Sequence, residues 1–99
     1  MEVVEINVAE AKKLIVENKD NVGFMILDVR TPEEFVKEHL QNAVNIDIHD
    51  EDFPEKIGKL DRTKTYLVHC RSGNRSRAAV ELMVEMGFAK VYNVRGWMF

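Results

Sequence analysis

Cysteine is nearly absent from this sequence, since Cys70 is the only one among 99 residues. A single thiol cannot form a disulfide within the chain, which is consistent with a reducing compartment. The three histidines, His39, His49 and His69, show none of the paired spacings that are typical of metal ligands. We therefore expect neither a disulfide framework nor a metal site.

Long apolar runs and an excess of basic residues are missing as well. No run approaches the roughly 20 residues that cross a bilayer, and the first residues lack the basic start and apolar block of a signal peptide. We expect a cytoplasmic protein without a membrane partner. Because 14 Lys and Arg stand against 17 Asp and Glu, the formal net charge is −3. A nucleic-acid partner usually demands a strong basic excess, so none is expected.

The remaining composition is that of an ordinary globular chain. Apolar residues make up 45% and charged residues 31%, which excludes a disordered or fibrous protein. A chain of this length closes one hydrophobic core and has nothing left for a second. We expect a single domain over residues 1–99.

Short apolar segments alternate with helical signals along the chain. Strands are predicted at residues 3–6, 23–29, 43–46, 65–69 and 90–94. Helix starts are predicted where Asn7 precedes Glu10 and where Thr31 precedes Glu34, because both pairs have the spacing of a capping box. A further helix is predicted over residues 76–86, ended by Gly87, and the acidic segment 50–60 is predicted to be partly helical. This alternation predicts an α/β fold with a mainly parallel sheet and helices on both faces.

The stretch VHCRSGNRSRAA, residues 68–79, places Cys70 between a predicted strand and a predicted helix. A lone cysteine is often only a small buried apolar residue. Here the turn and the helix start supply N–H donors, and three arginines, Arg71, Arg75 and Arg77, add positive potential; both effects lower a thiol pKa. Gly73 and Asn74 either provide a turn with positive φ or also let the loop approach a ligand. We expect Cys70 to be a nucleophile.

Asp28 and His69 are polar residues at the ends of predicted buried strands, so their surroundings must be accounted for. Asp28 ends the most apolar strand, at the sheet edge where ligands of such folds bind, and its charge requires a cation. Arg30 and the loop arginines are available, and we expect Arg75 to form a bidentate pair with Asp28. His69 precedes Cys70 on a strand, so its side chain should point to the other face. We expect a core histidine with satisfied hydrogen bonds, and no catalytic base.

Three segments together resemble the single-domain rhodanese family of sulfurtransferases. CRSGNRS (70–76) is similar to the family's C-x-x-G-x-R-[ST] loop, LDVRTPEEF (27–35) to its D-x-R-x-x-x-E-[YF] segment, and HLQNAVNI (39–46) to its G-H-I-x-G-A-x-N-I segment. The resemblance covers nearly the whole chain and implies a doubly wound, three-layer α/β domain.

The resemblance also implies a reaction. Cys70 would accept a sulfane sulfur from an anionic donor such as thiosulfate and pass it from a persulfide to cyanide, a thiol or a protein. No metal or organic cofactor is implied. The residues that would bind the donor or form the loop are Arg71, Ser72, Gly73, Asn74, Arg75 and Ser76, with Asp28 and Arg30 as support.

The sequence departs from the family pattern at three places. Glu38 and Asn42 stand where the family usually has glycine; Asn tolerates left-handed backbone, whereas Glu38 indicates a different turn. The chain ends in VRGWMF, where the family usually has a Gly-Gly pair and a further helical stretch, so we expect an abbreviated covering element. Whether Trp97 is packed, exposed or covered by a partner is left open.

Two other functions compete with sulfur transfer. Tyrosine and dual-specificity phosphatases use H-C-x-x-x-x-x-R, which would require arginine where this chain has Ser76; Arg75 and Arg77 flank that position. A catalytically silent module that binds a partner or senses redox state is the other, because a fold does not by itself confer activity. The presence of Cys70 favours the enzyme. The sequence names neither the physiological donor nor the acceptor.

Overall fold

The computed structural model describes residues 3–99 and contains a five-stranded sheet with the strand order β1-β5-β4-β2-β3. Every strand pairing is parallel. The strands are β1 (Val3–Asn7), β2 (Phe24–Asp28), β3 (Val44–Asn45), β4 (Thr65–His69) and β5 (Lys90–Arg95). The helices are α1 (Val8–Glu17), α2 (Pro32–Lys37), α3 (Phe53–Gly58) and α4 (Asn74–Glu85).

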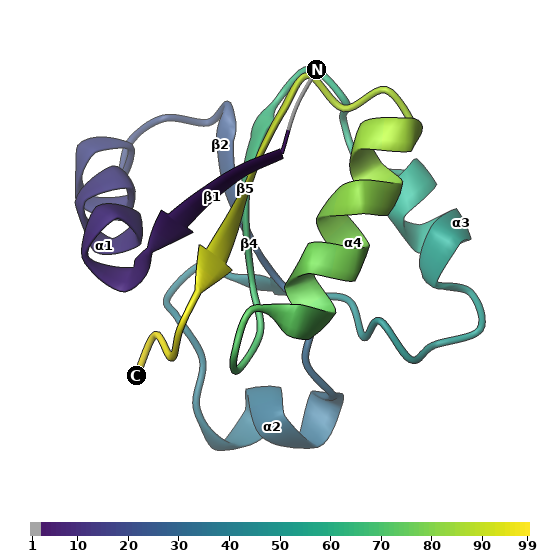
Figure 1. The fold of residues 1–99 in the computed structure, drawn as a ribbon, viewed down its shortest axis with the longest axis horizontal. Coiled ribbons are helices and arrows are strands. Elements are labelled where there is room, and N and C mark those ends of the chain that lie inside the picture. The colour runs from purple at the N-terminus through teal and green to yellow at the C-terminus, as the bar shows by residue number, and fades with distance from the viewer. Residues whose placement is uncertain (1–2) are drawn as a thin grey trace.

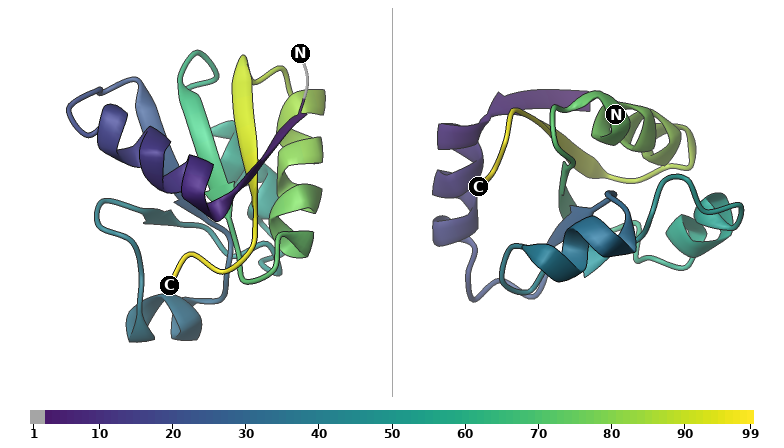
Figure 2. Two further views of the ribbon diagram at one scale, coloured as in Figure 1. Left: turned by 60° about the vertical axis from the view of Figure 1, so that its left-hand side comes forward. Right: turned by 90° about the horizontal axis from the view of Figure 1, so that it is seen from below.

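Helices cover both faces of the sheet, with α1 on one side and α3 and α4 on the other (Figures 1 and 2). Alternation along β4 explains the two layers, because Tyr66 and Val68 pack in the cluster shared with α3 and α4, whereas Leu67 packs in the cluster shared with α1. The predicted α/β fold with a parallel sheet between helical layers is confirmed. Within residues 3–99, no helix is long and apolar enough to cross a membrane.

The predicted helix signals are present, with small differences in the boundaries. Asn7 and Thr31 each form a full capping box with the glutamate three residues later. Helix α4 begins at Asn74, two residues before the prediction, because Gly73 adopts a φ of 105° and acts as its N-cap. Gly87, with a φ of 89°, follows α4. The segment predicted to be partly helical contains α3.

The carboxyl ends of the strands meet at one edge of the sheet. Asp28 ends β2 and lies beside His69, which ends β4 directly before Cys70. Helix α2 lies at this same edge (Figure 1). A Cβ atom at Gly73 would come within 3.1 Å of the Arg95 Cα and the Val94 carbonyl oxygen, so the turn after Cys70 packs against the end of β5. The fold thus brings the ends of β2, β4 and β5 and the helix α2 to the edge of the sheet where Cys70 lies.

Both departures from the family's glycines have a structural account. Asn42 has a φ of 67°, the left-handed conformation that asparagine tolerates. Glu38 is extended, with φ −166° and ψ 128°, so no glycine is needed there. Its carbonyl oxygen accepts a 2.6 Å hydrogen bond from Nη2 of Arg30.

Candidate active site

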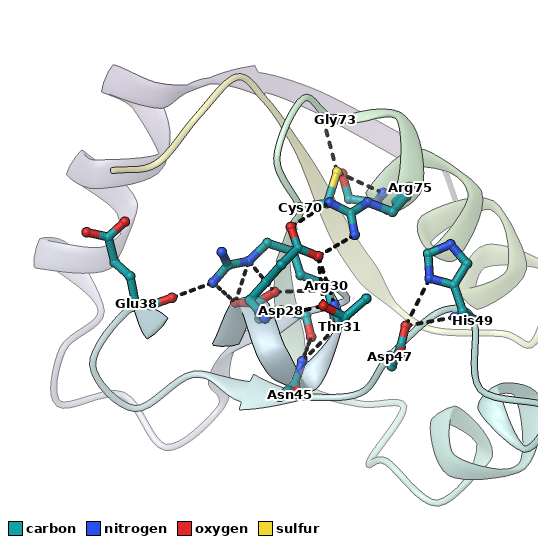
Figure 3. Close-up of polar contacts among 12 residues, drawn as sticks. Asp28, Arg30, Thr31, Glu38, Asn45, Asp47, His49, Cys70, Gly73 and Arg75 are labelled. Atoms are coloured by element: carbon teal, nitrogen blue, oxygen red, sulfur yellow. Dashed lines mark hydrogen bonds and ion pairs between the residues drawn. The ribbon is translucent and has the colours of Figure 1, made fainter. Parts of the chain in front are cut away.

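The Cys70 thiol is enclosed by hydrogen-bond partners from residues 70–76, here called the Cys70 loop. Its Sγ accepts a hydrogen bond from the Gly73 N–H at 3.1 Å (Figure 3). It also accepts one from the Ser76 N–H at 3.3 Å, and the Ser76 hydroxyl oxygen lies 3.4 Å away. The residue is only 1% exposed. The loop turns back at Gly73 and then enters α4, which aims both N–H groups at the sulfur.

These contacts change the acidity of the thiol. Burial raises the pKa of Cys70, but the hydrogen bonds with the Ser76 side chain and with the N–H groups of Ser76, Gly73 and Ser72 outweigh it. The net pKa therefore lies below the ordinary value of a cysteine. Because the thiolate is the nucleophilic form, the loop favours the reactive species.

Asp28 is paired with Arg30, so the expected pairing with Arg75 is wrong. The buried carboxylate accepts hydrogen bonds from the Arg30 backbone N–H at 3.0 Å, from Nε at 3.0 Å and from Nη2 at 2.8 Å. Both side chains are almost fully buried. Asn45 fixes the same strand end by donating to the carbonyl oxygens of Asp28 and Arg30, each at 3.0 Å. Asp28 and Arg30 thus form a buried ion pair beside the strand end from which the Cys70 loop starts.

Arg75 instead reaches α2 and forms a bidentate pair with Glu34. Its Nη1 donates to Oε1 at 2.7 Å and its Nη2 to Oε2 at 3.1 Å. The Arg75 guanidinium lowers the pKa of Glu34 to about 2. The pair still ties the Cys70 loop to its surroundings, but across a helix that was not expected to take part.

His69 is buried as expected, yet its hydrogen bonds are not satisfied. Neither ring nitrogen has a hydrogen-bond partner among residues 3–99, and Nε2 lies 3.7 Å from the Asp28 carboxylate. Burial lowers the pKa of His69 although Asp28 acts in the opposite direction, so the ring is uncharged near neutral pH. The Phe99 ring packs edge-on to it at 6.1 Å between centroids. His69 is thus the buried core residue that was expected, while the expected hydrogen bonds to its ring are not formed by side chains of residues 3–99.

Asn93 on β5 supports the Cys70 loop and was not identified from the sequence. Its Oδ1 accepts a 2.5 Å hydrogen bond from the Ser76 hydroxyl, and its Nδ2 donates to the Gly73 carbonyl oxygen at 3.3 Å. The residue is 1% exposed. A polar residue inside the apolar segment 90–94 is the signal that would have indicated a buried partner.

The other members of the Cys70 loop face outward. Arg71 is exposed, and its guanidinium carbon lies 5.4 Å from the centroid of the Trp97 ring. The Ser72 hydroxyl accepts a hydrogen bond from the Asn74 N–H at 3.4 Å, and the Ser72 carbonyl accepts one from Gly96 at 3.3 Å. Trp97 is 42% exposed, so it is packed on one side only.

The site combines a buried thiol with an exposed cation. The N–H groups of Gly73 and Ser76 stabilise negative charge on the Cys70 sulfur. The exposed Arg71 next to it can attract an anion. Among residues 3–99, no three histidine, cysteine, aspartate or glutamate side chains gather into a metal-binding group. The arrangement suits a reaction in which an anionic reagent meets a thiolate.

Comparison with known proteins agrees with this geometry. The rhodanese-like domain family matches residues 7–98. YtwF of Bacillus subtilis, whose name marks it as a candidate sulfurtransferase, is 38% identical over 98 residues, which is 99% of this chain and 89% of YtwF. Thiosulfate sulfurtransferase PspE of Escherichia coli is 38% identical over 72 residues, which is 71% of this chain and 67% of PspE.

A solved structure shows the same fold. The rhodanese-related protein of Thermoplasma volcanium superimposes with a TM-score of 0.76 at 37% identity, covering 96% of this chain and 86% of that protein. The family match, the curated relatives and this structure each extend over most of the chain. The chain therefore belongs to the rhodanese family.

Proposed function

We propose that this protein is a thiosulfate sulfurtransferase that carries the transferred sulfur as a persulfide on Cys70. The observation that carries the proposal is the set of hydrogen bonds at the Cys70 sulfur, where the Gly73 and Ser76 N–H groups lie 3.1 and 3.3 Å away. Such donors stabilise the attacking thiolate and then the charged persulfide.

The first half of the reaction consumes the donor. The Cys70 thiolate attacks the outer sulfur of thiosulfate, a bond forms between the two sulfur atoms, and the sulfur–sulfur bond of thiosulfate breaks. The electron pair of that bond leaves with sulfite. Arg71, the exposed cation next to Cys70, is the residue that attracts the anionic donor and the departing sulfite.

The second half regenerates the enzyme. A thiophilic acceptor attacks the terminal sulfur of the persulfide, and the electron pair of the broken bond returns to the Cys70 sulfur as thiolate. Cyanide would leave as thiocyanate; a small thiol or a protein thiol would leave as a persulfide. The chemistry requires a reduced Cys70, which suits a reducing compartment such as the cytoplasm.

The remaining loop residues take supporting roles in this proposal. Gly73 and Ser76 supply donors to the sulfur, and Ser72 and Asn74 shape the turn around Gly73 through a hydrogen bond between them. Arg75 holds the loop through its ion pair with Glu34, while Asp28 and Arg30 form the buried ion pair that supports the loop. PspE, a relative of this chain, is named a thiosulfate sulfurtransferase, which supports the choice of donor.

The contacts within the Cys70 loop favour this function over a phosphatase. Phosphate chemistry would need an arginine directed at the bound anion, but position 76 is a serine whose hydroxyl faces the thiol. Arg75 is engaged with Glu34 on α2. The lowered pKa of Cys70 likewise favours an enzyme over a silent binding module.

The experiment is thiocyanate formation from thiosulfate and cyanide with the wild type and with Cys70→Ser. The wild type should turn over, and the folded variant should show no activity above buffer because the hydroxyl is not a usable nucleophile here. Arg77→Ala, which changes a surface arginine of α4, should retain activity and serves as the control. Retained turnover in folded Cys70→Ser would overturn the mechanism.

A further inference from the structure

Arg71 differs from the other arginines around the site in its charge balance. Arg30 is paired with Asp28 and Arg75 with Glu34. Arg77, which follows the Cys70 loop, has carboxylate partners on β1 and α4. Arg71 has no carboxylate partner among residues 3–99. It is therefore the arginine whose charge remains available to an anion.

An aromatic ring takes the place of a carboxylate beside Arg71. The Arg71 guanidinium carbon lies 5.4 Å from the Trp97 ring centroid, within the range of a cation–π contact. Such a contact orients a guanidinium without neutralising it. An exposed arginine otherwise distributes its charge over many rotamers.

Trp97 is itself fixed on both sides. Gly96 before it donates a hydrogen bond to the Ser72 carbonyl oxygen, and Met98 after it is buried against α1 with 3% exposure. The Trp97 ring also contacts Phe99 edge-on, at 5.0 Å between centroids. The ring therefore stands at a defined place on the rim of the Cys70 loop.

We propose that Trp97 is a positioning residue that holds the Arg71 charge at the mouth of the Cys70 site. The ring fixes the guanidinium where it raises the local concentration of anionic reagents, and it leaves the charge uncompensated. That the natural reagent is an anionic sulfur donor rests on the proposed function. The role of Trp97 in holding the Arg71 charge near the thiol does not depend on the proposed function.

The test compares the rates at which Cys70 reacts with iodoacetate, an anion, and with iodoacetamide, which is neutral. Both reagents react with the same thiolate, so the ratio of the two rates removes effects of the Cys70 pKa and of its burial. Arg71→Ala and Trp97→Leu should each lower the ratio roughly 2- to 5-fold, the size expected when one exposed charge near the thiol is removed or no longer held in place. The Trp97 ring also lies 5.6 Å from the Arg30 guanidinium carbon, but the Arg30 charge is compensated by Asp28. The double variant should therefore show no further fall, because the ring affects the anionic reagent through Arg71.

Matched variants separate positioning from packing. Arg77→Ala removes a cation that already has carboxylate partners, so it should leave the ratio unchanged. Trp97→Phe keeps an aromatic face and should keep most of the ratio, and it remains informative should Trp97→Leu fail to fold. A wild-type ratio in folded Trp97→Leu would overturn the proposal. So would additive effects of the Arg71 and Trp97 changes, or a Trp97→Phe ratio as low as that of Arg71→Ala.

Steady-state kinetics give a second readout. Trp97→Leu should raise the KM for thiosulfate and leave kcat nearly unchanged, as should Arg71→Ala. A general loss of structure would instead lower kcat. If the wild type forms no thiocyanate while the alkylation ratios follow the expected pattern, the proposed function fails and the positioning role stands; the reverse result rejects the positioning role alone.

Discussion

Glu34 and Arg75 join helix α2 to the Cys70 loop through two parallel hydrogen bonds of 2.7 and 3.1 Å. The same carboxylate accepts hydrogen bonds from the backbone N–H and the hydroxyl of Thr31, each at 3.1 Å, and so caps α2. One side chain thus fixes the helix start and the loop at once. Displacing it should affect both.

Glu34→Gln should lower stability in a pH-dependent manner. The Arg75 guanidinium lowers the pKa of Glu34 from 4.5 to about 2, so the pair stabilises the fold above about pH 4.5 and loses this effect as the pH falls toward 2. The difference in unfolding free energy between wild type and variant should be about 1 kcal/mol near neutral pH, since the pair is partly exposed. It should shrink in acid, because wild-type Glu34 is then protonated and loses its charge as well, while glutamine can retain the helix cap.

Urea unfolding at several pH values measures this difference. Glu33→Gln is the control, because it removes a charge from the same turn of α2 without touching Arg75, and it should change stability by less than about 0.5 kcal/mol. A constant difference between Glu34→Gln and wild type from pH 7 to pH 3 would show that the ion pair is not the source of the effect.

Cys70 should titrate below the roughly 8.5 of a free cysteine. Burial raises its pKa, but hydrogen bonds led by those from Ser76 lower it further than burial raises it. Ser76→Ala removes the hydroxyl and should shift the alkylation midpoint upward from that of the wild type. Ser72→Ala is the control, because it keeps the backbone donors of the loop and should leave the midpoint near the wild-type value.

The measurement is the rate of iodoacetamide alkylation against pH. A wild-type midpoint at or above about 8.5 would mean that the N–H groups do not stabilise the thiolate. An unchanged midpoint in folded Ser76→Ala would assign the shift to the backbone donors alone.

Arg30→Ala should be strongly destabilising, by about 3–5 kcal/mol, because it leaves the fully buried Asp28 carboxylate without its partner. Thermal and denaturant unfolding measure the loss. The double variant with Asp28→Asn should recover part of the stability, since the unpaired charge is then removed. A single-variant loss below about 1 kcal/mol would show that solvent or another cation satisfies Asp28.

Much of this architecture could be predicted from the sequence because it depends on local signals. The apolar runs mark the strands, and Asn7 and Thr31 mark helix starts through side chains three residues away. The environment of Cys70 was predictable for the same reason, since the donors belong to the turn and helix start that follow it.

Partners far apart in the sequence could not be assigned in this way. Arg30 and Arg75 were both available to Asp28, and only the path of the chain decides between them. Arg30 follows two residues later on the same side of the strand end, a spacing that favours the pair that forms. The pairing of Glu34 with Arg75 depends on where α2 packs, which no local pattern encodes.

The most direct test of the central claim is the intact mass of the purified, reduced protein before and after thiosulfate. Wild type should gain the mass of one sulfur atom and lose it again when cyanide is added, while Cys70→Ser should gain none. No added sulfur on the wild type, or the same gain on Cys70→Ser, would contradict the persulfide on Cys70.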